Sequence, residues 1–309
     1  MKAFNSALAL FLMLASGLFG IRATAKPASA RPNILLILAD DMSWAHTSIE
    51  GDPAVKTPNF DRLAKSGVRF TYAFCSSPSC TPSRGAILTG QAFCRLEEGG
   101  SLLSTLQTKF PVYPDILEKV GYQVSFCGKG WDPGDWRAAG RTRNPAGNQS
   151  GSLSAFLEKL PPGKPFCFWA GSHDPHRPYT VDSGVKGGIQ LSNIAVPPIV
   201  PDARDMRRDL ADYFFEIQRF DSNLGILLAE LERKNLATNT LIVVTSDNGM
   251  PYPRGKCNLY DWGTRMPLAI GWLGRIPPDR VIDDFVSLTD LAPTFLEAAG
   301  LPIPKAMTG

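Results

Sequence analysis

The sequence has 309 residues, of which 44% are hydrophobic and 20% are charged, and its formal net charge is +3. Because its 32 basic side chains barely outnumber its 29 acidic ones, the chain has no overall field that would attract a polyanion. This balance argues against nucleic-acid binding, so affinity for an anionic ligand must come from a local cluster of charges. The length suffices for one large α/β domain with a substantial core.

The first 25 residues have the pattern of a secretory signal peptide. Lys2 precedes an apolar run over residues 7–21, and the small residues 23–25 provide a cleavage site after Ala25. An uncleaved membrane anchor is the alternative, but the run is short for a bilayer span and no second apolar segment follows it in the sequence. We therefore expect export to the bacterial periplasm or the extracellular space, with no integral membrane segment after cleavage.

Three apolar runs are each followed by a polar loop. Residues 33–39 precede Asp40 and Asp41, residues 166–170 precede the sequence SHDPH, and residues 240–246 precede Asp247 and Asn248. Continuous apolar runs are typical of buried strands in parallel sheets. Because ligands bind beyond the carboxyl ends of such strands, the three loops predict a single site.

Helical patterns lie between these runs. Thr57 and Pro58 suit the start of a helix that Gly67 ends, and residues 206–234 carry apolar side chains at steps of three and four. Residues 286–300 predict a strand followed by a helix that Asp290 caps. The alternation of strands and helices predicts a layered α/β fold. The Pro-, Gly- and Arg-rich stretches 132–152 and 175–205 predict surface loops that are suited to substrate selection.

Six cysteines occur, at positions 75, 80, 94, 127, 167 and 257. In an exported chain they could form three disulfides, although this number is low for a scaffold that depends on disulfides. Cys127 and Cys167 lie in strand-like runs, where a small buried side chain is the simpler interpretation. Cys80 could be a buried thiol, half of a disulfide or a site of chemistry.

Asp40, Asp41, Asp247 and Asn248 offer only oxygen atoms to a ligand. Such a cluster suits Ca²⁺ or Mg²⁺. Only three histidines occur in the sequence, at positions 46, 173 and 176, so a dinuclear zinc site is not expected. The alternative is that the acidic pair caps a helix and that residues 247–249 form a turn.

The stretch CTPSRGAILTG, residues 80–90, combines Cys-x-Pro-x-Arg with a following Leu-Thr-Gly. Together with RPNILLILADD at 31–41, GKG at 128–130 and SDNG at 246–249, it resembles the signature of the formylglycine-dependent (type I) sulfatases. The segments at 171–179 and 246–263 are most similar to the heparan N-sulfatase (sulfamidase) branch and its bacterial relatives. The resemblance implies an alkaline-phosphatase-like layered fold, with a large, mostly parallel central sheet flanked by helices.

The resemblance also implies a mechanism. Cys80 would be oxidised by a formylglycine-generating enzyme, and its hydrated aldehyde would attack the sulfur of a sulfate ester or N-sulfate on a glycosaminoglycan or other sulfated polysaccharide. His173 would be the general acid near the leaving group. One Ca²⁺ would be bound by residue 80 together with Asp40, Asp41, Asp247 and Asn248. Arg84 would hold the formylglycine diol, and Lys129 and Lys256 would neutralise the charge of the sulfate.

Other charged residues are open to two interpretations. His176 and Arg177 could contact an anionic group of the substrate or brace their loop, and Arg254 is a similar case. His46 has no motif around it, so we expect an ordinary histidine there.

The sequence departs from the family pattern at two places. Trp131 stands where many sulfatases have a histidine two residues after the lysine, and it could instead form a flat wall for a sugar ring. Family members continue into a small C-terminal subdomain, so we expect residues 26–309 to be an N-terminal catalytic domain that lacks it. Two alternatives follow: a phosphate or phosphonate monoester hydrolase of the same superfamily, and a truncated, non-catalytic protein that binds sulfated glycans.

Overall fold

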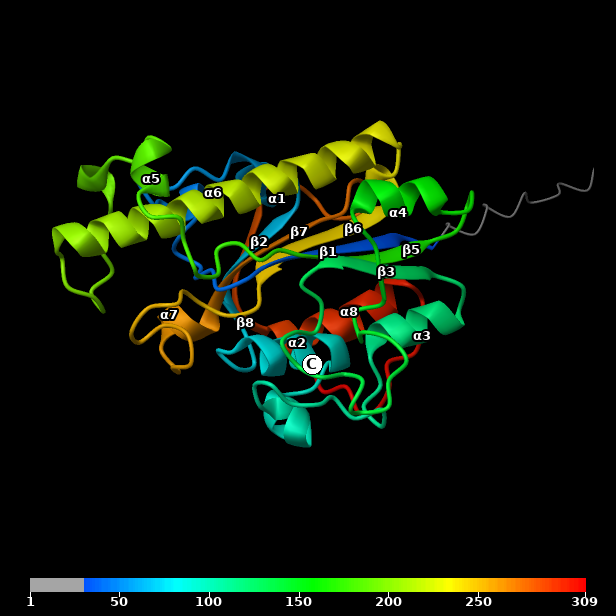
Figure 1. Ribbon diagram of the computed structural model, residues 1–309. Helices are drawn as coiled ribbons and strands as arrows, with labels where there is room; N and C mark the ends of the chain where they lie inside the picture. Colours follow the sequence, from blue (N-terminus) through cyan, green and yellow to red (C-terminus); the bar gives the residue numbers. More distant parts are fainter. Residues whose placement is uncertain (1–30) are drawn as a thin grey trace, which may run out of the picture. The chain divides into compact units, whose positions relative to one another are not determined.

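An eight-stranded sheet runs through the centre of the computed structural model, which describes residues 31–309 (Figure 1). The predicted signal peptide lies outside the described residues. The strand order is β4-β3-β5-β1-β6-β7-β2-β8, and every neighbouring pair is parallel except the two that β7 makes with β6 and β2. The strands are β1 (Asn33–Ala39), β2 (Val68–Phe74), β3 (Gln123–Gly128), β4 (Asn148–Gln149), β5 (Phe166–Gly171), β6 (Thr240–Ser246), β7 (Arg265–Gly271) and β8 (Arg280–Ser287).

The three predicted apolar runs form adjacent central strands. All residues of β1, β5 and β6 are buried, which explains why these runs are apolar without alternation. β1 pairs with β5 on one side and with β6 on the other, and Ala39 lies opposite Ser246. The carboxyl ends of β1 and β6 are therefore level, so the polar residues after them meet.

Helices cover both faces of the sheet. Leu35 and Ile37 of β1 pack in a core with one set of helices, and Ile34, Leu36 and Leu38 pack in a second core with the other set. The first set is α1 (Pro58–Ser66), α4 (Leu153–Lys159) and α6 (Arg204–Arg233), and the second is α2 (Cys80–Thr89), α3 (Tyr113–Lys119) and α8 (Leu291–Ala298). The predicted layered α/β fold, with helices flanking a mostly parallel sheet, is confirmed (Figure 1).

The shorter helices lie in the connections. These are α5 (Ser183–Lys186), α7 (Asp261–Thr264) and the 3₁₀ turns η1 (Ser48–Glu50), η2 (Phe93–Arg95), η3 (Glu97–Gly100), η4 (Leu191–Asn193), η5 (Ala237–Asn239) and η6 (Leu288–Asp290). Among residues 31–309, no helix is both long and apolar enough to span a bilayer.

The helix boundaries differ from the prediction at one cap. Thr57, Pro58 and Gly67 bound α1 as expected. Asp290 precedes α8, but its carboxylate accepts the backbone N–H of Ser287 and forms a capping box for η6. The cap therefore serves the preceding turn, because the chain enters α8 without leaving helical geometry.

Candidate active site

Three carboxylates gather at the carboxyl ends of β1 and β6. Asp40, Asp41 and Asp247 are at most 1% exposed. The backbone N–H groups of Asp41 and Asn248 both donate to Oδ1 of Asp247, at 3.2 and 2.8 Å. Asp41 has a φ of 75°, a left-handed conformation that costs energy for a residue with a side chain and that is concentrated at functional sites.

Cys80 begins α2 directly beside these carboxylates. Its Sγ lies 3.6 Å from Oδ1 of Asp40 and 3.2 Å from Nζ of Lys256, and the residue is 3% exposed. Burial, with the added repulsion of Asp247 and Asp40, raises the pKa of the Cys80 thiol to about 12. An unmodified cysteine here is therefore a poor nucleophile, since the thiolate is the reactive form.

Arg84 lies one helical turn after Cys80 and is completely buried. Its Nε donates to Oδ2 of Asp247 at 2.7 Å. Nη1 donates to the carbonyls of Lys129 and Gly130, at 2.9 and 3.0 Å. Nη2 makes no hydrogen bond within the described chain and lies 3.7 Å from Asp40. One donor of this guanidinium is therefore available to a further acceptor.

Two lysines complete the charge cluster. Nζ of Lys129, just after β3, donates to Oδ2 of Asp40 at 2.7 Å. Nζ of Lys256 lies 2.7 Å from Oδ1 of Asp41. Although burial opposes ionisation, the nearby Arg84 and both lysines hold the pKa of Asp247 below its usual value. Burial and the charge of Asp247 instead raise the pKa of Asp40.

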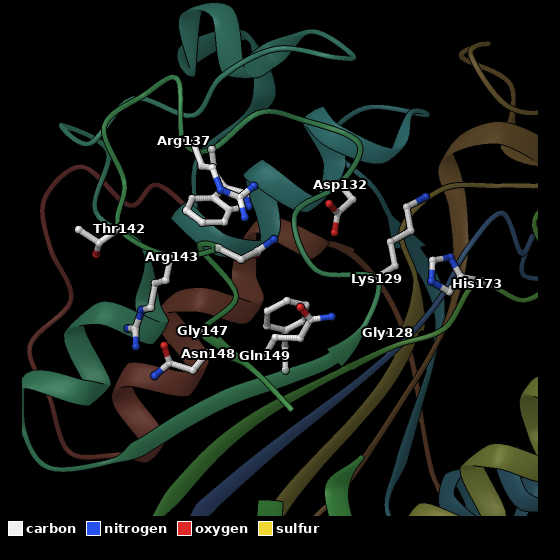
Figure 2. Close-up of a pocket in the computed structure, with 13 residues that line it drawn as sticks. Gly128, Lys129, Asp132, Arg137, Thr142, Arg143, Gly147, Asn148, Gln149 and His173 are labelled. Atoms are coloured by element: carbon white, nitrogen blue, oxygen red, sulfur yellow. The ribbon is translucent and has the colours of Figure 1, made fainter. Parts of the chain in front are cut away.

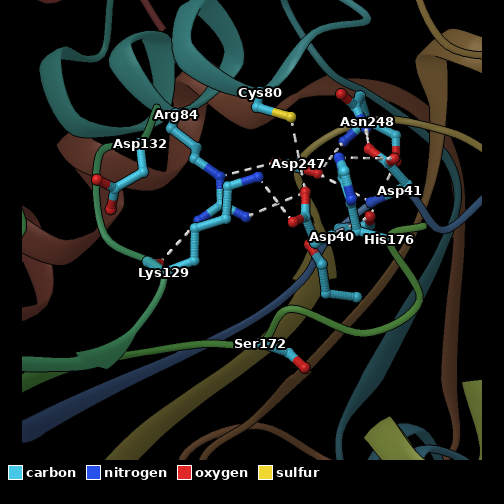
Figure 3. Close-up of polar contacts among 12 residues, drawn as sticks. Asp40, Asp41, Cys80, Arg84, Lys129, Asp132, Ser172, His176, Asp247 and Asn248 are labelled. Atoms are coloured by element: carbon cyan, nitrogen blue, oxygen red, sulfur yellow. Dashed lines mark hydrogen bonds and ion pairs between the residues drawn. The ribbon is translucent and has the colours of Figure 1, made fainter. Parts of the chain in front are cut away.

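The carboxylates and Asn248 fit a divalent cation. Oδ1 of Asn248 is buried and has no hydrogen-bond partner among residues 31–309. Ligand atoms of Asp40, Cys80 and Asp247 lie within 4.8 Å of one another. Figure 3 shows these side chains converging below Cys80. Hard cations prefer such oxygen donors, and a buried amide oxygen without a hydrogen-bond partner is suited to bind one.

The histidines occupy three different settings. His173 lies in the loop after β5 with much of its surface exposed, and the partial burial of its ring, together with Lys129 and Arg84, lowers its pKa. His176, in the SHDPH loop that was predicted to meet the acidic loops, brings Nε2 to 3.7 Å from Asp41. His46 is buried rather than on the surface. Its Nδ1 pairs with Asp52 at 3.1 Å and its ring packs against aromatic side chains, whereas Nε2 has no hydrogen-bond partner among residues 31–309.

Arg177 braces its own loop. Its guanidinium is paired with both carboxylate oxygens of Asp209 and lies over the rings of Tyr179 and Tyr252, at 4.5 and 4.9 Å. Of its two interpretations, the structure therefore supports the brace. Arg254 is exposed, and no ion pair joins it to an acidic side chain within residues 31–309.

Trp131 does not form a wall for a sugar ring, so that expectation is wrong. The side chain is 0% exposed and belongs to the core that contains α2. Its indole N–H donates to the carbonyl of Thr81 at 3.1 Å, and its backbone N–H donates to Asn144 at 3.0 Å. Gly134 packs so close that an added Cβ would lie 2.4 Å from the indole. Trp131 therefore supports the helix that carries Cys80.

A pocket of about 490 Å³ opens beside Lys129 and His173 (Figure 2). Its other walls come from β4 and from the loop between β3 and β4, with Trp136, Arg137 and Gln149 among them. The sequence predicted residues 132–152 to be a surface loop suited to substrate selection, and residues of this stretch do line the pocket. Apart from Gly128, Lys129 and His173, no motif marks the pocket residues, which become neighbours only when β4 pairs with β3.

All six cysteines are free. Cys75, Cys80 and Cys167 are buried, and Cys127 is partly buried. The interpretation of Cys167 as a buried core side chain is confirmed, and Cys127 packs against the core from its edge.

Residues 32–147 and 151–301 match the family model that is described as Sulfatase. The chain belongs to the sulfatase family. The human N-sulphoglucosamine sulphohydrolase is 30% identical over 317 residues, which cover 89% of this chain and 62% of that protein. An ulvan-active sulfatase from Formosa agariphila is 28% identical over 299 residues, which cover 91% of this chain and 57% of that protein. The chain thus spans about three fifths of the length of these two relatives.

Solved structures show the same fold. A protein crystallised with its substrate D-glucosamine-2-N,6-O-disulfate superposes with a TM-score of 0.73 at 21% identity, over 90% of this chain and 78% of that one. The phosphonate monoester hydrolase from Silicibacter pomeroyi superposes with a TM-score of 0.75 at 19% identity, over 90% and 75%. The predicted alkaline-phosphatase-like fold and the resemblance to sulfatases are both confirmed.

Proposed function

We propose that this chain holds the catalytic centre of an exported sulfatase that hydrolyses a sulfate ester or an N-sulfate on a carbohydrate. The observation that carries the proposal is the placement of Cys80, whose Sγ lies between Lys256 and Asp40 at the edge of a buried acidic cluster. Membership of the sulfatase family and the similarity to an N-sulphoglucosamine sulphohydrolase support this reaction class.

Cys80 becomes the nucleophile after oxidation to formylglycine by a formylglycine-generating enzyme. The raised pKa of its thiol makes direct attack by the unmodified side chain ineffective. The hydrated aldehyde supplies an oxygen nucleophile and a second hydroxyl, whose deprotonation allows the sulfate to leave. Arg84 orients residue 80 with the Nη2 donor that has no hydrogen-bond partner in the described chain.

The two lysines bind the sulfate oxygens. Lys129 and Lys256 reach the site from different elements and place their ammonium groups on Asp40 and Asp41, on the two sides of the acidic cluster. Prepositioned cations stabilise negative charge that builds up in the transition state, and they do so best where water is excluded.

Asp40, Asp41, Asp247 and Asn248 would hold one Ca²⁺ beside residue 80. The unpaired amide oxygen of Asn248 and the three buried carboxylates support this assignment. Ca²⁺ accepts a larger and more flexible oxygen set than Mg²⁺, which favours Ca²⁺. When it is bound, the cation offsets negative charge next to the reacting group.

His173 donates the proton to the leaving oxygen or nitrogen. It lines the pocket together with Lys129, so a saccharide in the pocket would present its leaving group to the imidazole. Burial and the neighbouring cations lower the pKa of His173, and the imidazolium therefore gives up its proton readily.

The substrate class is a sulfated glycan, either a glycosaminoglycan or another sulfated polysaccharide. The similar proteins include an N-sulphoglucosamine sulphohydrolase and an ulvan-active sulfatase, both of which act on sulfated sugars by name. The signal pattern of residues 1–25 supports action in the periplasm or outside the cell.

The test combines mass spectrometry with sulfate release. Protein from its native host should give a residue-80 peptide about 18 Da lighter than the cysteine form. Wild-type protein should release free sulfate from defined sulfated saccharides, and Cys80→Ser should not. Cys94→Ser, at an exposed cysteine, is the matched control and should retain activity. An unmodified thiol at residue 80 in active native protein would overturn the mechanism.

The same assay separates the alternatives. Faster hydrolysis of aryl phosphate or phosphonate than of any sulfate would indicate the phosphonate hydrolase function. Glycan affinity that is identical in wild type and Cys80→Ser, with no sulfate released by either, would indicate a binding protein.

A further inference from the structure

The pocket beside Lys129 and His173 has room for more than a sulfate group. Its volume of about 490 Å³ lies in the range of small-molecule sites, about 300–1,000 Å³. Arg137 and Arg143 line it away from His173 (Figure 2). A sugar whose sulfate is at residue 80 would therefore extend toward these arginines.

Some of the cationic side chains in the pocket are already paired with a carboxylate, and one is not. Lys129 is paired with Asp40 at 2.7 Å. Arg143 is paired with Asp115 and Glu118, at 2.8 and 2.6 Å. No acidic side chain of residues 31–309 pairs with exposed Arg137, whose charge is therefore available to a ligand.

Arg137 is also held in place. Its guanidinium carbon lies 4.0 Å from the centre of the Trp136 ring, and Trp136 packs against the core. Oδ1 of Asp135 accepts the backbone N–H of Arg137 at 3.0 Å and so fixes the turn. A guanidinium stacked on an aromatic ring keeps its N–H edge free for bidentate binding of an oxyanion, with little conformational entropy left to lose.

We propose that Arg137, stacked on Trp136, binds a second anionic group of the saccharide, either a sulfate or a uronic acid carboxylate. This inference rests on the proposed sulfatase function and narrows its substrates to doubly charged glycan units. Asn148 and Gln149, exposed in β4 at the same pocket, supply hydrogen bonds to sugar hydroxyls.

The kinetic test compares D-glucosamine-2-N,6-O-disulfate with glucosamine N-sulfate. Wild type should hydrolyse the disulfate with a kcat/KM about 10- to 100-fold higher, as expected for one charge-assisted bidentate contact. Arg137→Gln should remove most of this preference, and Arg137→Lys should retain part of it. Arg204→Gln, at an exposed arginine of α6 on the opposite side of the sheet, should retain all of it.

A third substrate identifies the source of the anion. An N-sulfated disaccharide with a uronic acid neighbour is compared with its carboxyl-reduced form. If wild type prefers the uronic acid disaccharide to its carboxyl-reduced form and Arg137→Gln does not, Arg137 binds the carboxylate. If wild type prefers only the disulfate to the monosulfate, Arg137 binds the second sulfate. A preference that persists in Arg137→Gln for both pairs overturns the subsite.

Direct binding keeps this inference separate from the proposed reaction. Isothermal titration of Cys80→Ala protein with the same saccharides needs no turnover, and Arg137→Gln in that background should weaken binding of the doubly charged ligand about tenfold or more. If wild type releases no sulfate but this loss of affinity is seen, the reaction is wrong and the subsite stands. Equal affinities for singly and doubly charged ligands overturn the subsite even in an active enzyme.

Discussion

Replacement of Trp131 tests whether this side chain supports the nucleophile helix or takes part in substrate binding. The indole is 0% exposed, so Trp131→Ala should lower the free energy of unfolding by about 3–5 kcal/mol, the usual cost of deleting a buried aromatic side chain. Trp131→Phe removes mainly the N–H bond to Thr81 and a smaller part of the buried volume, which together cost about 1–3 kcal/mol. Both variants loosen the first turn of α2, so kcat should fall more than KM changes.

Urea unfolding followed by tryptophan fluorescence and circular dichroism measures the stability loss, and sulfate release measures kcat and KM. Trp272→Ala, at a partly buried tryptophan beyond β7, is the control and should cost less than Trp131→Ala. Trp131→His restores the residue type that many sulfatases have, but the side chain here points into the core against Gly134. It should destabilise the protein without accelerating sulfate release. A stable Trp131→Ala with raised KM, or a faster Trp131→His, would refute the structural role.

Three further predictions concern titration. Burial raises the pKa of Asp40, so at mildly acidic pH a cation can bind there only by displacing a proton. Ca²⁺ affinity measured by calorimetry should therefore weaken as pH falls toward 5, and affinity independent of pH would contradict this. Because the pKa of His173 is lowered, the protonated acid is lost at a lower pH than in an ordinary histidine, so kcat should decline as pH rises, starting below the usual titration range of histidine. His173→Gln should be about 10²- to 10⁴-fold slower and lack that decline. In protein made without the modifying enzyme, iodoacetamide at pH 8 should label exposed Cys94 at least a thousandfold faster than Cys80, whose pKa is about 12; equal rates would disprove the burial argument.

The acidic cluster could be predicted because its residues directly follow the ends of two central strands. The runs that became β1 and β6 are continuously apolar, which is the pattern of central parallel strands, and each ends in a polar pair. Once Ala39 lies opposite Ser246, Asp40 and Asp247 have to be neighbours. The position of Cys80 beside them does not follow from periodicity. The role of Cys80 was predicted from the Cys-x-Pro-x-Arg motif, whose spacing places Arg84 one helical turn away.

Lys129 and His173 were predicted, but the other side chains of the pocket wall could not be, because long-range contacts decide where they point. The place of Trp131 in the motif suggested that it faces the site, but hydrogen bonds to Asn144 and Thr81 turn it into the core. Arg137 lies in a loop with no motif, and it reaches the pocket only because β4 pairs with β3 and Trp136 is anchored. A stretch rich in Pro, Gly and Arg predicts a surface loop, but it does not predict which of its side chains line a pocket.

The charges around residue 80 explain how a nearly neutral chain can attract an anion. Asp40, Asp41 and Asp247 are matched by three buried or half-buried cations, so the cluster without a metal is close to neutral. A bound divalent cation would leave a net charge of about +2 in a setting where water screens little. With 32 bases against 29 acids, the chain as a whole does not attract polyanions. Its attraction for anions is confined to the edge of the sheet where we propose that the sulfate binds. An unpaired Arg137 extends this positive region along the pocket, which directs a doubly charged sugar into one orientation.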